Sequence, residues 1–131
     1  MKKALALVSV ISLLFSTGFD TQDGAPIRQG VHIEWYRTVA PGSNGEAVFV
    51  WSDTRYGMRN IFAHKIDQNG QLLWGEQGAV VTDLPGRQED PVAITDGSGG
   101  VFIAWVDYRF DEQGDISVSY THLTLPTMFE V

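Results

Sequence analysis

The chain has 131 residues, of which 16 are acidic and nine are basic, giving a net charge of −7, and it has no cysteine. An excess of carboxylates disfavours contact with the phosphates of nucleic acid or with anionic lipid, so neither partner is expected. Without cysteine the chain has no disulfide, no thiolate metal site and no cysteine-linked lipid anchor. A hydrophobic content of 44% suits one modest folded domain.

The first 18 residues have the organisation of a secretory signal peptide. Lys2 and Lys3 form a basic start, residues 4–15 are apolar, and Ser16 to Gly18 are small residues suited to cleavage. The apolar run is short for a bilayer span and no second run follows, so we expect an exported protein with no membrane segment after cleavage. Residues 19–27 are expected to form a linker.

Side-chain alternation predicts the strands of a first unit. Residues 31–37 form its opening strand and residues 45–55 its next strand. In the latter, Trp51 and Asp53 share one face and Val50 belongs to the other. Both faces are apolar, which is typical of a strand covered on both sides by other sheets. Residues 56–60 are then expected to be a loop.

The rest of the first unit continues the same pattern. Residues 61–66 form a further strand, and residues 67–70 have the Asn and Gly chemistry of a tight turn. Residues 71–74 begin another strand, which residues 79–82 continue either after a bulge or as an edge segment. A loop at residues 84–87 then leads to a strand at 91–95, where a leading proline is tolerated.

Residues 99–109 nearly repeat residues 45–55. Trp51, Asp53 and Arg55 recur 54 positions later as a second Trp-x-Asp-x-Arg motif, formed by Trp105, Asp107 and Arg109. A strand-rich repeat of about 50 residues is typical of a propeller, a solenoid or an array. With four short antiparallel strands per unit and no helix beyond the signal peptide, the sequence favours propeller-type blades in an all-β fold.

The number of blades sets the expected organisation. Residues 28–83 form a first repeat and residues 84–117 a truncated second one, about one and two-thirds blades in all, whereas closed propellers have roughly four to eight. The chain therefore cannot close a ring alone. It either assembles with other copies or is the N-terminal piece of a longer protein, and the order of signal, blade and partial blade favours the second reading.

A resemblance supports this organisation. The motif around Trp51, followed by residues 60–67, Gly70, Leu73-Trp74, Gly78, residues 88–91 and Gly99-Gly100, resembles the blades of secreted bacterial β-propeller repeat proteins. The resemblance covers residues 28–116. It implies a sialidase-type propeller shape, often with a type IX sorting domain, in a protein of a Gram-negative-type bacterium that is secreted or located at the cell surface or in the periplasm. It also implies a binding or structural role toward a glycan or protein.

The tail departs from that pattern. Asp115-Ile116 aligns with Asn60-Ile61, but residues 118–131 have no counterpart in the first unit and resemble translated sequencing-adaptor sequence. We therefore expect the tail to be non-native and attach no function to His122 or Glu130. Its β-propensity still favours a strand across residues 117–125.

The paired Asp and Arg residues of the motif have two readings. Asp53 and Arg55, like Asp107 and Arg109, lie two residues apart and so on one face of a strand end, where they form charge-assisted bonds to each other or to a ligand. Because the pair recurs at the same place in both units, a structural clamp is favoured over a single catalytic site.

A sialidase-like glycoside hydrolase is the competing function. Sialidases use a tyrosine nucleophile, and most other glycosidases use paired carboxylates. The chain offers suitable residue types without a diagnostic spacing: Arg55, Arg109, Tyr56, Tyr108 and Glu89. Residues 67–74 also resemble the structural Asp-box turn of sialidases, with one residue too many and without its threonine. Enzymatic activity is therefore not the favoured reading.

The sequence offers one candidate ligand site and two candidate calcium sites. Trp35 and Tyr36 form the one candidate for a sugar-stacking platform. Oxygen ligands for calcium are offered by Asp67 with Asn69, and by Asp111, Glu112 and Asp115, but neither group has the spacing of an EF-hand, so ordinary turns are favoured and no cofactor is expected. His32, His64 and His122 share no ligand spacing, and His64 is expected to pack in the core or at an edge.

Overall fold

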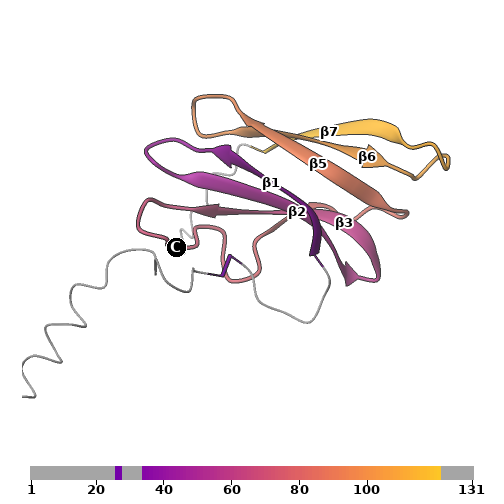
Figure 1. The fold of residues 1–131 in the computed structure, drawn as a ribbon, viewed down its shortest axis with the longest axis horizontal. Coiled ribbons are helices and arrows are strands. Elements are labelled where there is room, and N and C mark those ends of the chain that lie inside the picture. The colour runs from indigo at the N-terminus through magenta and orange to yellow at the C-terminus, as the bar shows by residue number, and fades with distance from the viewer. Residues whose placement is uncertain (1–25, 28–33, 122–131) are drawn as a thin grey trace, which may run out of the picture.

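The computed structural model describes residues 26–27 and 34–121. These residues form seven strands and no helix, arranged in two antiparallel sheets (Figure 1). The expected all-β, antiparallel class is confirmed for this part of the chain. The signal peptide, most of the linker, residues 28–33 of the first repeat and the tail beyond Thr121 lie outside the described residues.

The first sheet contains four strands in the order of the sequence. They are β1 (Glu34–Pro41), β2 (Ala47–Tyr56), β3 (Met58–Ile66) and β4 (Ala79–Thr82). The expectation of a loop at residues 56–60 is wrong, because Tyr56 pairs with Met58 across a turn at Gly57. Gly57 has a φ of 93°, a conformation that glycine adopts without steric cost, and this lets both strands continue to the turn.

The turn at Asp67 is confirmed. Its carbonyl accepts a hydrogen bond from the Gly70 amide at 3.0 Å, and its carboxylate accepts bonds from the amides of Asn69 and Gln71. The strand expected at residues 71–74 is reduced to one bridge between Leu72 and Ile66. The chain then bulges away from β3 over residues 75–78 and pairs with it again as β4.

The second sheet contains β5 (Gln88–Thr95), β6 (Val101–Asp107) and β7 (Asp115–Thr121), again in sequence order. β5 begins three residues before the strand expected at 91–95. β7 runs into the atypical tail, as the β-propensity of that segment predicts.

The two sheets have the same internal pairing. Each of the six pairs between β1 and β2 recurs between β5 and β6 with both partners displaced by 54 positions, from Glu34 with Asp53 to Gln88 with Asp107. The register also shifts at the same place, after Trp35 in the first sheet and after Glu89 in the second. Such a bulge bends the strand and increases its twist, so both sheets open with strands of the same local shape.

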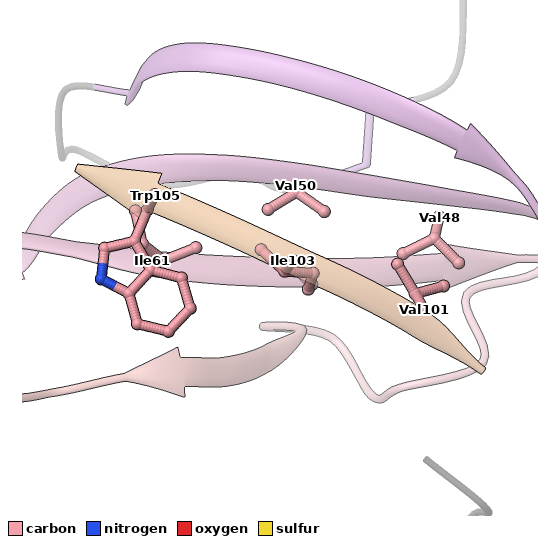
Figure 2. Close-up of a cluster of buried hydrophobic side chains, with 7 residues drawn as sticks. Val48, Val50, Ile61, Val101, Ile103 and Trp105 are labelled. Carbon is pink, nitrogen blue, oxygen red and sulfur yellow. The ribbon is translucent and has the colours of Figure 1, made fainter. Parts of the chain in front are cut away.

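The core lies between the two sheets. Val48, Val50, Ile61 and Ala63 of the first sheet pack against Val101, Ile103 and Trp105 of β6, and Figure 2 shows the β6 side chains projecting toward those of β2 and β3. Trp74, Val81 and Ala93 pack around this cluster. Each large side chain buried in this way contributes about 1.5–3 kcal/mol.

Burial differs between the two sheets. In β3 the adjacent residues Ile61 and Phe62 point to opposite faces and both are fully buried, so this central strand is buried on both faces. In β6 only the face of Ile103 is buried, and Phe102 on the other face is 45% exposed. The expectation that both copies of the repeated strand are covered on both faces is therefore wrong for β6, because the first sheet covers only one of its faces.

Candidate functional site

The motif residues of the first sheet form one closed set of contacts at the end of β2. The Trp51 indole donates from Nε1 to Asp53 Oδ2 at 2.9 Å. Arg55 donates to the same carboxylate from its backbone amide at 3.0 Å and from Nη2 at 2.6 Å. Its Nη1 reaches the carbonyl of Gln77 at 2.9 Å, and its guanidinium lies 3.8 Å from the Phe62 ring centroid.

The electrostatics of Asp53 follow from these contacts. Its side chain has no exposure to solvent, and burial alone raises the pKa of a carboxyl group. Hydrogen bonds from the Arg55 side chain and amide and from the Trp51 indole outweigh burial, so the pKa of Asp53 lies below its ordinary value. Asp53 is therefore a carboxylate whose oxygens are already occupied by donors from its own strand.

The second motif has the same pair with a different neighbour. Arg109 donates to Asp107 from its amide at 3.1 Å and from Nε at 2.7 Å, and Ser117 of β7 donates from Oγ at 3.0 Å. Burial again raises the pKa of Asp107, and the bonds from Arg109 and Ser117 outweigh it and lower that pKa. The side chain of Arg109 is more exposed than that of Arg55, at 26% against 9%.

The two tryptophans differ in one bond. Trp51 and Trp105 are each 5% exposed, but the Nε1 of Trp105 is buried without an acceptor. The Asp107 oxygen Oδ2 accepts instead from Arg109 and Ser117. The motifs thus hold the same charges in the same places and differ in the indole, which has an acceptor in the first motif and none in the second.

A charged cluster lies where the two sheets meet. Glu89 of β5 is almost fully buried and pairs with Arg59 of β3, and Arg87 Nε lies 3.3 Å from the same carboxylate oxygen. The Arg59 guanidinium lies 4.1 Å from the Trp35 ring centroid, and that of Arg87 lies 3.9 Å from the Tyr108 centroid. Cation–π contacts of this kind hold each arginine between its acid and an aromatic ring.

Several of the sequence candidates meet in this cluster. Glu89 and Tyr108 are brought together through Arg87, and Trp35 joins them through Arg59. Tyr56 lies apart, in contact with Phe62. The side chain of Tyr36 is outside the described residues, so the proposed Trp35-Tyr36 platform is described for Trp35 alone.

An open groove borders the cluster on the side of the second sheet. Its volume is about 610 Å³, and its lining comprises Met58, Gly86, Arg87, Tyr108, Arg109, Phe110, Asp111 and Glu112. Phe110 is 76% exposed there. Aromatic rings beside arginine and carboxylate groups offer both stacking and hydrogen bonds to a polar ligand.

The sequence analysis missed Arg59 and Arg87. The spacing of Arg87 and Glu89 on one strand face is visible in the sequence, but Arg59 reaches Glu89 from a strand 30 residues earlier in the chain. Only the packing of β3 against β5 brings them together.

The acidic calcium candidates serve as turn residues. The Asp67 carboxylate accepts backbone amides from its own turn, and Asp111 Oδ1 likewise accepts the amides of Gln113 and Gly114 at 2.9 and 2.8 Å. A similar turn, not singled out in the sequence, joins β5 to β6 through Asp96. Within residues 26–27 and 34–121, no group of three or more histidine or acidic side chains is arranged to hold a metal ion.

His64 is packed, as expected. It is fully buried in β3, with Nε2 lying 2.5 Å from the Gly75 carbonyl and Nδ1 lying 3.1 Å from the Lys65 carbonyl. The imidazole therefore ties the bulge at residues 75–78 to the first sheet.

Among the described residues there is no helix with the length and apolar character needed to cross a membrane. Comparison with family models, with curated proteins and with solved structures finds no match to this chain.

Proposed function

We propose that the chain is the N-terminal part of an exported β-propeller repeat protein of the secreted bacterial type, with a binding or structural role at the cell surface or outside the cell. The observation that carries this proposal is the common register of β1–β2 and β5–β6, including the shared bulge. Two units of the same construction, stacked face to face, are what consecutive propeller blades require.

In this proposal the Trp-x-Asp-x-Arg motif is a structural clamp of each blade. Asp53 and Asp107 accept hydrogen bonds from residues of their own sheets, and Arg55 also donates to the Gln77 carbonyl. A ligand that displaced these contacts would leave a buried charge unpaired, which costs about 3–5 kcal/mol. The motif therefore supports the scaffold, and a ligand binds elsewhere.

The groove beside Phe110 is the proposed contact surface for a glycan or a protein loop. Phe110 and Tyr108 supply aromatic surface, and Arg87 with Glu112 supplies polar groups. Among the described aromatic side chains, Phe110 is the most exposed, and an exposed phenylalanine in a concave surface is well suited to stack on a sugar ring or an apolar side chain.

The test is binding of the purified chain to a glycan array and to extracts of secreted proteins, with Phe110→Ala beside it. We expect the variant to lose at least tenfold in affinity for any bound glycan or protein. Leu72→Ala, on the exposed turn that follows β3, is the matched control and should bind as the wild type does. Equal binding by both variants, or no binding by the wild type, would remove the groove from the proposal.

A sialidase-like glycoside hydrolase is the second candidate, favoured by one observation. Arg87 and Tyr108 line the groove and stack on each other, and the buried Glu89 carboxylate lies behind them, 3.3 Å from Arg87 Nε. Turnover of sialyl and other aryl glycosides, abolished by both Glu89→Gln and Tyr108→Phe, would replace the scaffold role with catalysis. Absence of turnover by the wild-type chain would count against this candidate.

A further inference from the structure

One face of the first sheet and the corresponding face of the second sheet are built from equivalent residues. This face is covered in the first sheet and exposed in the second. Pairing places Ile61 opposite Ser52 in the first sheet, and Ile116 opposite Val106 in the second. Since Val106 follows Ser52 by 54 positions, Ile61 and Ile116 are equivalent. Ile61 is fully buried, whereas Ile116 is 76% exposed.

The same contrast holds across the whole face. Val48 and Val50 are fully buried, and their equivalents are Phe102, which is 45% exposed, and the partly exposed Ala104. Ala63 is fully buried, and its equivalent Val118 is 68% exposed. The exposed face of the second sheet is therefore the counterpart of the surface that, in the first sheet, packs against β6.

The exposed side chains form two continuous rows rather than scattered points. Ile94, Phe102 and Tyr120 are cross-strand neighbours on β5, β6 and β7, and the Phe102 and Tyr120 ring centroids lie 4.6 Å apart. Val92, Ala104 and Val118 form the adjacent row. A contiguous exposed apolar surface of this kind marks a site of association, whereas exposed apolar side chains that are scattered singly do not.

We propose that this face, formed within the second repeat by Val92, Ile94, Phe102, Ala104 and Ile116, binds a third antiparallel sheet supplied by a further unit of the same polypeptide. The proposal rests on the repeat organisation in the proposed function and names the surface and the partner that extend it. The partner presents a strand of the β6 kind, apolar-x-apolar-x-Trp, because Val101, Ile103 and Trp105 are the side chains that cover the equivalent face of the first sheet.

A second copy of the chain is a poorer partner. The β6 side chains that would cover the face are already buried against their own first sheet. The matching strand of the first sheet is β2, and its Trp51 is 5% exposed. A Cβ on Gly78 would lie 3.2 Å from the indole, and the Arg55 guanidinium lies 5.9 Å from the indole centroid and 3.8 Å from that of Phe62. Within residues 34–121, a copy therefore has no free strand of the required kind, whereas a further unit brings its own.

The test extends the chain by its own repeat. Thr121 pairs with Val101 as Ile66 pairs with Ala47, so a second copy of residues 67–121 inserted after Thr121 continues the chain at an equivalent junction. The inserted copy of residues 67–82 gives the second sheet a fourth strand, and the inserted copy of β5–β7 forms the third sheet. The chain has no cysteine, so Ile116→Cys in the original unit gives a single thiol on the exposed face.

We expect the thiol of the Ile116→Cys variant to react quickly with a maleimide in the unextended chain and at least tenfold more slowly in the extended one. Asn69→Cys, on the exposed turn after β3, is the matched control and should react equally in both. Equal reactivity of the Ile116→Cys thiol in the two chains overturns the proposal, whether the added strands fold elsewhere or fail to fold on this face. If the thiol of the unextended chain reacts more slowly as the protein concentration rises, a second copy of the chain covers the face and the proposal is overturned.

These outcomes are independent of ligand binding. Loss of binding on Phe110→Ala with an unprotected thiol would leave the groove in place and remove only the third sheet. If the thiol is protected in the extended chain but no ligand is found for the wild type, the third sheet stays in place and only the groove is removed from the proposal.

Discussion

Trp51 and Trp105 stand at equivalent positions and are equally buried, but only the indole of Trp51 has a hydrogen-bond acceptor. In the second sheet, Ser117 and Arg109 donate to the Asp107 oxygen that corresponds to the acceptor of Trp51. A buried donor without an acceptor costs about 1–3 kcal/mol, so the two indoles contribute unequally to stability.

Replacing each indole by phenylalanine should expose this difference. Trp51→Phe removes a bond to a carboxylate, whereas Trp105→Phe removes an unsatisfied donor, and both lose a similar volume. We expect Trp51→Phe to lower the free energy of unfolding by about 1–3 kcal/mol more than Trp105→Phe does. Urea unfolding of the two variants measures the difference, and equal losses would mean that Trp105 finds an acceptor in solution.

Acid should destabilise the fold through Asp53 and Asp107. Both carboxyl groups have a lowered pKa in the folded protein, so the stability they provide is complete above their ordinary pKa of 3.8 and is lost as the pH falls through the folded values. We therefore expect the free energy of unfolding to fall below about pH 4.

The carboxyl resonances of the two residues, followed by NMR through an acid titration, test this directly. Ser117→Ala removes one donor from Asp107 and none from Asp53, so it should raise the pKa of Asp107 alone. A variant that shifts both titrations, or neither, would contradict the assigned contacts.

Replacing two glycines of the bulge by alanine distinguishes the cost of backbone strain from the cost of close packing. Gly75 and Gly78 have φ values of 74° and 73°, but a Cβ on Gly75 meets nothing within 4 Å, whereas a Cβ on Gly78 would lie 2.6 Å from the Ala63 carbonyl oxygen. Gly75→Ala should cost about 1–2 kcal/mol for the left-handed conformation. Gly78→Ala should cost clearly more, because the bulge must also move away from β3.

The matched pair is compared by thermal and urea unfolding. A lower melting temperature for Gly78→Ala than for Gly75→Ala is the expected order. The reverse order would mean that the bulge does not lie against β3 in solution.

The Glu89 cluster should be sensitive to charge and salt. Glu89→Gln leaves Arg59 and Arg87 without their shared acid, and because both arginines are partly exposed, the loss should be about 1–2 kcal/mol rather than that of a fully buried pair. Adding about 1 M salt should destabilise the wild type more than the variant, since salt screens the ion pair. Glu112→Gln changes an exposed acid that lines the groove beside the cluster, and as the control it should change stability little.

Local chemistry explains which expectations from the sequence succeeded. The turn at Asp67 depends on hydrogen bonds within five residues, and the Asp53 and Arg55 contact depends on two residues of one strand. The expectation at residues 56–60 failed because a segment that contains Gly57 and ends in Asn60 is compatible either with a loop or with a one-glycine turn. Continued pairing of β2 with β3 selects the turn.

Contacts between distant strands were not accessible from the sequence. Arg59 meets Glu89, and Asn60 donates to Gln88 at 2.9 Å, only because β3 and β5 belong to different sheets that pack together. Nothing in the local pattern of either strand specifies its partner across that interface.

The strand class, the repeat distance and the chemistry of each motif follow from the amino-acid sequence, because alternation and short-range hydrogen bonds act within a few residues. Which apolar faces are buried depends on how the two sheets pack. Ile61 and Ile116 occupy equivalent positions in the same kind of strand, and one is enclosed while the other faces solvent. Burial of a sheet face depends on whether another sheet lies against it, and that is a property of the stack rather than of the strand.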